Sequence, residues 1–316
     1  MNWTIPVIPG ALSLLLLASC GGAGDALDEV AGANATEESS RFHYNREYVF
    51  VAPSGDAPFV VPFNFRAAEF DGEIEREVRG WLARGDAWDR FIDDTRRARS
   101  AGGVWRVVPH GDLRITAGGP TQLETLHFQQ SDRQLRLQFE APLTDWQQGG
   151  ETRFRLLRGR LSVGAETISG PVLELLRVER TLEDGWPPGK DFDSLFLTSG
   201  DSIQLLLSET LSGDGQGEGY AWIRARGTER IWNDGEVRWL DVQPYEDARR
   251  DIPTGWSFRV PGAAVAGELD AVGFDVVLGP ERGGRRAVEI RYSVTGWVEI
   301  QGERRDVFGA IRHTQQ

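Results

Sequence analysis

Apolar and polar residues alternate along most of the chain beyond residue 104, as they do in strands that bury one face. In the stretch RQLRLQFEA, Leu135, Leu137 and Phe139 lie on one face, and charged or polar residues separate them. The stretches GWSFRVPG and RRAVEIRYSVTG repeat this alternation, and turn-forming stretches such as GGP, NDG and ERGG stand between such runs. The pattern predicts a mainly β, antiparallel protein.

A different spacing occupies residues 69–100. Ile74, Val78 and Trp81 stand at positions i, i+4 and i+7, which places them on one face of a helix. The following stretch, AWDRFIDDTRRARS, repeats that spacing and ends in basic residues, which suit the negative end of a helix dipole. We therefore expect a short helical insert near residues 69–100, packed on the β scaffold or serving as a docking element.

A turn-rich segment divides the β region. The stretch LEDGWPPGKD, Leu182–Asp191, holds two prolines and two glycines between runs of strand-like sequence. The sequence therefore predicts two antiparallel lobes, each a barrel or a sandwich: an N-terminal lobe over residues 42–183, which carries the insert, and a C-terminal lobe over residues 190–316.

The N-terminal stretch SLLLLASCGG contains the one cysteine of the chain, Cys20. The tetrapeptide that ends at Cys20 resembles a bacterial lipobox, in which the cysteine sulfur receives a lipid, so residues 1–19 are read as a lipoprotein signal peptide. An ordinary secretory peptide or a buried strand are the alternatives. Residues 20–41 are small and acidic, as expected of a flexible tether. Because Gly21 stands where inner-membrane lipoproteins of enteric bacteria carry Asp, we expect a lipid anchor in the outer membrane of the cell envelope.

Charge and composition narrow the range of partners. The net charge of −13 disfavours a nucleic-acid partner and electrostatic adhesion to anionic lipid, so the expected membrane partner is reached through acylated Cys20. The four histidines show no metal-ligand spacing, and no phosphate-binding loop or nucleophile elbow is present. We expect no metal and no cofactor.

Several motifs of the C-terminal part resemble those of a known family. The stretches FDSLFLTSGDSIQLLLSETL, DGEVRWLDVQPYED and IPTGWSFRVPG occur there in order, and YSVTGWVEIQGERRDVFGAIRH follows. This part resembles the C-terminal lobe of the hydroxyneurosporene synthase (carotenoid 1,2-hydratase) and AttH-like group. The resemblance implies two lipocalin-like β-barrels and a leaning toward apolar, isoprenoid-like ligands, but it assigns no catalytic residue.

The residues expected to bind a ligand lie in the C-terminal lobe. Trp256 shares a face with Phe258, and Trp239 shares one with Val237, so these aromatic side chains should point inward, where they either fill the core or line a cavity. Of the acidic residues on apolar runs, Asp193, Asp241 and Asp275 are the candidates for catalysis, although each also suits a strand edge or a turn. The leading expectation is a non-catalytic binder of an apolar molecule. The alternatives are an envelope enzyme, hydratase-like or polysaccharide-acting, and a structural or assembly lipoprotein without a small ligand.

Overall fold

The computed structural model describes most of the chain beyond residue 40. The described ranges are 41–54, 57–70, 73–99, 111–117, 123–148, 152–181, 191–200, 202–210 and 219–316. Cys20, the expected signal peptide and all but the last residue of the expected tether lie outside them. Ser39–Gln316 form one compact unit.

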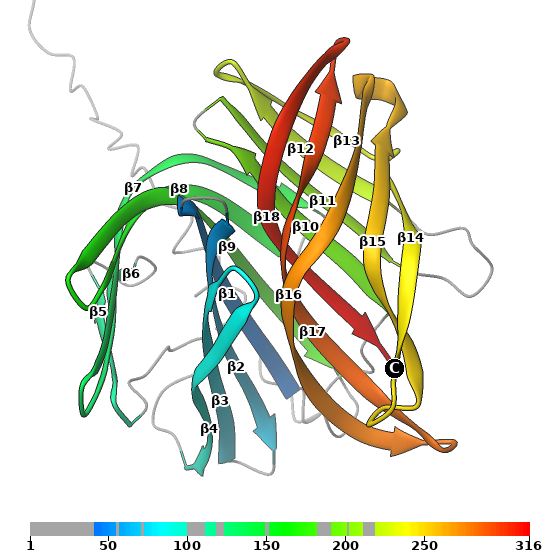
Figure 1. The fold of residues 1–316 in the computed structure, drawn as a ribbon. Helices are drawn as coiled ribbons and strands as arrows, with labels where there is room; N and C mark the ends of the chain where they lie inside the picture. Colours follow the sequence, from blue (N-terminus) through cyan, green and yellow to red (C-terminus); the bar gives the residue numbers. More distant parts are fainter. Residues whose placement is uncertain are drawn as a thin grey trace, which may run out of the picture. The chain divides into compact units, whose positions relative to one another are not determined.

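The fold consists of two nine-stranded antiparallel sheets, one from each half of the chain. In Figure 1 the first sheet runs from blue to green, and the second, a nearly closed barrel, runs from yellow-green to red. The strands of the first sheet are β1 (Arg41–Ser54), β2 (Ala57–Phe70), β3 (Glu73–Arg84), β4 (Ala87–Ala98), β5 (Leu113–Ala117), β6 (Leu123–Gln130), β7 (Arg133–Gln148), β8 (Thr152–Val163) and β9 (Glu166–Thr181). The strands of the second are β10 (Phe192–Ser199), β11 (Ile203–Thr210), β12 (Gly219–Ala225), β13 (Thr228–Trp232), β14 (Glu236–Tyr245), β15 (Arg250–Val260), β16 (Val265–Arg282), β17 (Arg285–Ile300) and β18 (Glu303–Gln315).

The two sheets share one topology. The strand order is β4-β3-β2-β1-β9-β8-β7-β6-β5 in the first sheet and β13-β12-β11-β10-β18-β17-β16-β15-β14 in the second. In both, neighbouring strands are joined as hairpins, and the first strand also pairs with the last. The mainly β, antiparallel architecture expected from the alternation is confirmed, and the two sheets are consistent with the lipocalin-like lobes that the family resemblance implied.

The expected helical insert at residues 69–100 is wrong, because this segment forms the hairpin β3–β4. A spacing of four residues fits a strand as well as a helix, and Ile74 and Val78 lie on one face of β3. Trp81 is also buried, but its indole bonds to the second sheet. In β4 a bulge opposite Gly80 and Trp81 adds one residue, Phe91, beside Ile92, and both enter the same core. Because β3 buries residues on both faces and β4 contains a bulge, the apolar residues of this hairpin are spaced as they would be in a helix.

Each sheet encloses its own apolar core, and a third cluster joins them. The core of the second sheet alternates along its strands, so that Leu195 and Leu197 of β10 point inward while Phe196 points outward. Phe196 belongs to a cluster that also contains Val49 and Val51 of the first sheet. The sole helical turn of the described residues is the 3₁₀ turn Pro261–Ala263, and none of their helices is long and apolar enough to cross a membrane.

Candidate functional site

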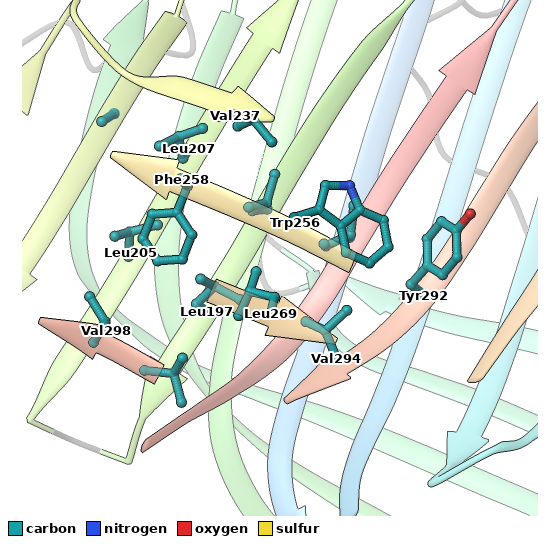
Figure 2. Close-up of a cluster of buried hydrophobic side chains, with 14 of the residues drawn as sticks. Leu197, Leu205, Leu207, Val237, Trp256, Phe258, Leu269, Tyr292, Val294 and Val298 are labelled. Atoms are coloured by element: carbon teal, nitrogen blue, oxygen red, sulfur yellow. The ribbon is translucent and has the colours of Figure 1, made fainter. Parts of the chain in front are cut away.

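Two of the three expected ligand residues pack inside the second sheet. Trp256 and Phe258 of β15 are buried among aliphatic side chains, as Figure 2 shows, and Phe258 lies against Gly267 so closely that a side chain at 267 would collide with its ring. The Trp256 ring meets that of Tyr292 edge to face, with centroids 4.9 Å apart. Both residues therefore contribute to the packed core.

Trp239 of β14 has a different environment. It is half-buried at one end of the second sheet, and its indole N–H donates to Oδ2 of Asp193 at 2.7 Å. Its ring meets the imidazole of His313 edge to face, with centroids 5.3 Å apart. Trp239 also lines a surface pocket, so it connects the buried contacts around Asp193 with the outside.

A buried carboxylate–imidazole pair lies behind Trp239. Asp193 of β10 and His313 of β18 face each other in the pairing of these strands, and Oδ1 of Asp193 lies 2.6 Å from Nδ1 of His313. Neither side chain has any solvent exposure. Alternation explains the placement, because Asp193 continues the inward face of Leu195 and His313 continues that of Ile311.

Three polar atoms in this part of the second sheet, one of them in the pair itself, are buried and make no hydrogen bond within the described residues. They are Nε1 of Trp256, the hydroxyl of Tyr292 and Nε2 of His313. Burial, and then the negative charge of Asp193, raise the pKa of Tyr292, so its hydroxyl keeps its proton and can donate. Buried polar groups are usually satisfied, and a set left open in one region indicates a place where water or a ligand group binds.

A second acidic side chain belongs to the same end of the barrel. Glu209 of β11 accepts a hydrogen bond from the backbone N–H of Val237 in β14, so it joins two strands that are not neighbours in the sheet order. The pKa of Glu209 is raised above its ordinary value, chiefly because the side chain is buried. The hydrogen bond from Val237 opposes this rise, and the negative charge of Asp193 adds to it. Glu209 thus helps to close the barrel near Asp193.

The pocket in front of Trp239 has a volume of about 370 Å³, within the range of small-molecule sites. It opens where the end of β14, the start of β15, the start of β17 and the end of β18 meet. Its lining consists of Trp239, Pro244, Tyr245, Glu246, Arg249, Arg250, Asp251, Arg285 and Gln315. Gln315 is two residues beyond His313, on the same face of β18, so the pocket and the buried pair adjoin.

Some of the side chains that meet at this candidate site are among those singled out in the sequence. Trp239 was expected to bind a ligand and Asp193 was among the acidic candidates, but His313 and Tyr292 were not singled out. The sequence signal for His313 is its place in the alternation with Ile311, which marks an inward polar residue on an apolar strand. Of the other acidic candidates, Asp241 sits at a bulge in β14, and Asp275 bonds to Trp81 and Arg90 of the first sheet. Cys20 lies outside the described residues.

The fold is AttH-like. A candidate AttH protein from Nitrosomonas europaea superposes with a TM-score of 0.59 at 13% identity, over 98% of this chain and 99% of its own. Kievitone hydratase from Nectria haematococca gives a TM-score of 0.56 at 12% identity, over 85% of this chain and 87% of its own. No protein-family model matches the sequence, and no curated protein matches it either. Both structural likenesses cover the first sheet as well as the second.

Proposed function

We propose that the chain binds a small, largely apolar molecule at the Trp239 pocket of its second sheet. The observation that carries the proposal is a pocket of ligand size backed by buried polar groups without partners. Aromatic faces at Trp239 and Tyr245 offer apolar contact, while the hydroxyl of Tyr292 and Nε2 of His313 could each serve one polar group of the ligand. Trp256 and Phe258 would support the site from the core, behind the pocket.

Intrinsic fluorescence tests this proposal. Farnesol, an apolar chain with one hydroxyl, is titrated into the protein and into the variants Trp239→Phe and Trp297→Phe. We expect saturable quenching that Trp239→Phe removes and Trp297→Phe retains, because Trp297 is a half-buried tryptophan of the same sheet that does not line the pocket. Circular dichroism checks that both variants fold. Equal quenching in the two variants, or none in the parent, would count against the pocket and leave a structural or assembly role.

Catalysis is the second candidate function, and one observation favours it. Nδ1 of His313 lies 2.6 Å from Oδ1 of Asp193, while Nε2 of His313 and the hydroxyl of Tyr292 are both buried without a hydrogen-bond partner in the described part of the chain. Such a set could move a proton to or from a bound molecule, as a hydratase requires. Mass spectrometry of the extracted ligand decides between the two functions: an unchanged mass favours binding alone, and a gain of one water favours the enzyme.

We also propose that the protein is attached to the bacterial envelope, in the outer membrane, by acylation of Cys20. The support is the lipobox-like sequence before Cys20 and the acidic, small-residue stretch after it. Radiolabelled palmitate should label the parent protein, and detergent should extract it with the membrane fraction. Cys20→Ala should abolish the labelling; labelling that persists in this variant would disprove the anchor.

A further inference from the structure

The mouth of the Trp239 pocket is basic, although the protein as a whole carries a net charge of −13. Three lining residues are arginines, Arg249, Arg250 and Arg285, and two are acidic, Glu246 and Asp251. Three positive and two negative charges leave one positive charge. A local excess of this kind, at the opening of a pocket in an acidic protein, favours the approach of a single negative charge.

The arginines lie at two turns of the backbone, one that ends at Arg249 and one that precedes Arg285. Arg249 closes a turn by donating its backbone N–H to the carbonyl of Glu246 at 3.1 Å, and it adopts a left-handed conformation with φ of 54°. Its guanidinium donates to the carbonyl of Gly284, at 3.0 Å, in the turn that precedes Arg285. The guanidinium of Arg250 donates to the carbonyl of Arg286 at 2.7 Å. Arg249 and Arg250 are therefore oriented by backbone carbonyl groups, and Arg250 also donates to the carbonyl of Gln316.

The ion pair of Arg249 competes weakly for the charge of its guanidinium. Arg249 lies 3.8 Å from Glu281, and both side chains are largely exposed, so solvent screens the pair. A planar guanidinium has five N–H donors, and a carboxylate matches two of them at once. Arg249 thus retains donors for a second acceptor after its bond to Gly284.

Gln315 supplies a buried polar group deeper in the pocket. Its residue exposure is 9%, it lines the pocket, and its Oε1 has no hydrogen-bond partner within the described residues. By turning about its last bond the amide presents Nε2 in the same place, so it can serve an acceptor as well as a donor. The pocket therefore combines exposed cationic donors with one buried amide whose oxygen has no partner within the described residues.

We propose that the mouth is a subsite for the carboxylate of an amphiphilic monoanion, held by Arg249 and Arg285. The apolar part of this ligand packs against Trp239 and Tyr245, and Nε2 of Gln315 donates a further hydrogen bond to the same carboxylate. The inference rests on the proposed ligand-binding function and specifies the chemical class of the ligand. A single carboxylate matches the one excess charge, whereas a dianion would leave charge without a partner.

The test compares octanoate with 1-octanol, which has the same chain without the charge. Isothermal titration at neutral pH measures both ligands against the parent protein, Arg249→Gln, Arg285→Gln and the control Arg282→Gln. Arg282 is an exposed arginine of the same hairpin that does not line the pocket. We expect octanoate to bind more tightly than octanol, and each pocket variant to weaken octanoate by about tenfold while leaving octanol unchanged. The control should change neither.

The outcomes separate this subsite from the pocket itself. Equal affinity for the two ligands, or equal loss in the pocket variants and in the control, overturns the carboxylate subsite while octanol binding still supports the pocket. Absence of binding by both ligands overturns the subsite and the proposed pocket together. Affinity for octanoate that falls with rising salt, with octanol unaffected, supports the charge contact.

Discussion

Asp193 is the residue on which the buried contacts of the second sheet converge. Its two oxygens take separate partners, the indole N–H of Trp239 and Nδ1 of His313. A carboxylate without solvent exposure is costly unless it is hydrogen-bonded, so these two contacts are what make the position tolerable. They also orient the imidazole, because a carboxylate oxygen only accepts, so the proton between the two side chains is on Nδ1 of His313.

Asp193→Asn should therefore reverse the tautomer of His313. The indole of Trp239 is only a donor, so it should keep the amide oxygen, and the amide nitrogen should then donate to Nδ1 and move the ring proton to Nε2. We expect the free energy of unfolding in urea to fall by about 1–3 kcal/mol, since one strong bond is exchanged for a weaker one. Nitrogen-15 NMR of the His313 ring measures the tautomer.

The control for this substitution is Asp306→Asn, on an exposed position of the same sheet. It should leave both the urea midpoint and the His313 spectrum unchanged. An Nδ1–H tautomer that survives in Asp193→Asn would show that Asp193 does not set the protonation of the ring.

The sequence predicted one half of this pair and missed the other for a physical reason. Asp193 stands out as an acidic residue within an apolar run, and alternation alone places it inward. His313 is 120 residues away, and the two meet because the first strand of the sheet pairs with the last. Alternation fixes which way a side chain points along one strand, but a partner across a closing strand pair depends on the register of the whole sheet.

The hairpin β3–β4 shows the same limit for a whole element. Its apolar spacing was compatible with a helix because β3 buries residues on both faces: Val78 enters the core of the first sheet, and Trp81 donates to Asp275 of the second. By contrast, β15 has the simple alternation of Trp256, Phe258 and Val260, and all three are buried in one core. The simple alternation of β15 could be predicted from the sequence, whereas the pattern of β3, with apolar residues on both faces, could not be told from that of a helix.

Contact between the sheets also explains the position of Trp222. In the sequence, Trp222 shares one face of β12 with Arg224, and this alternation alone predicts a position at a rim or on the outer surface. It does lie on the outer face of its sheet, yet it is buried, because it stacks on Trp146 of the first sheet with ring centroids 4.2 Å apart. Outer-face residues can therefore be core residues of the whole molecule, and a single strand gives no sign of this.

The two sheets are also joined by ion pairs that are buried or half-buried. Glu47 of β1 bonds to Arg291, and it accepts from Arg312 at 2.9 Å. Arg66 of β2 donates to Glu289 of β17 at 2.6 Å. Removing one member of such a network leaves its charged partners unpaired and poorly solvated, which commonly lowers the free energy of unfolding by about 3–5 kcal/mol. The charges of this ion-pair network should therefore contribute to the stability of the contact between the two sheets.

The titration of these carboxylates makes stability depend on pH. Burial alone would raise the pKa of Glu289, but Arg312, Arg66 and Arg291 outweigh it and hold the pKa well below its ordinary value of 4.5. The pKa of Glu47 is also lowered: burial alone would raise it, but the positive charges of Arg291 and Arg312 outweigh burial. A pKa that is lower in the folded state gives stability that is complete above the unfolded value and is lost as pH falls toward the folded one. Glu77 acts in the opposite sense, because burial raises its pKa.

We therefore expect the free energy of unfolding to be constant near neutral pH and to fall as the pH drops below about 4.5, with the loss from Glu289 and Glu47 exceeding the gain from Glu77. Urea unfolding at neutral pH and at about pH 4 measures the difference. Glu289→Gln should lower stability at neutral pH by about 3–5 kcal/mol and should flatten the acid dependence, because no charge is then left to neutralise at that position. Glu299→Gln, an exposed carboxylate on the same strand, should retain the parent's full dependence. An acid dependence as steep in Glu289→Gln as in Glu299→Gln would show that the contact with Arg66 and Arg312 does not govern how the two sheets separate.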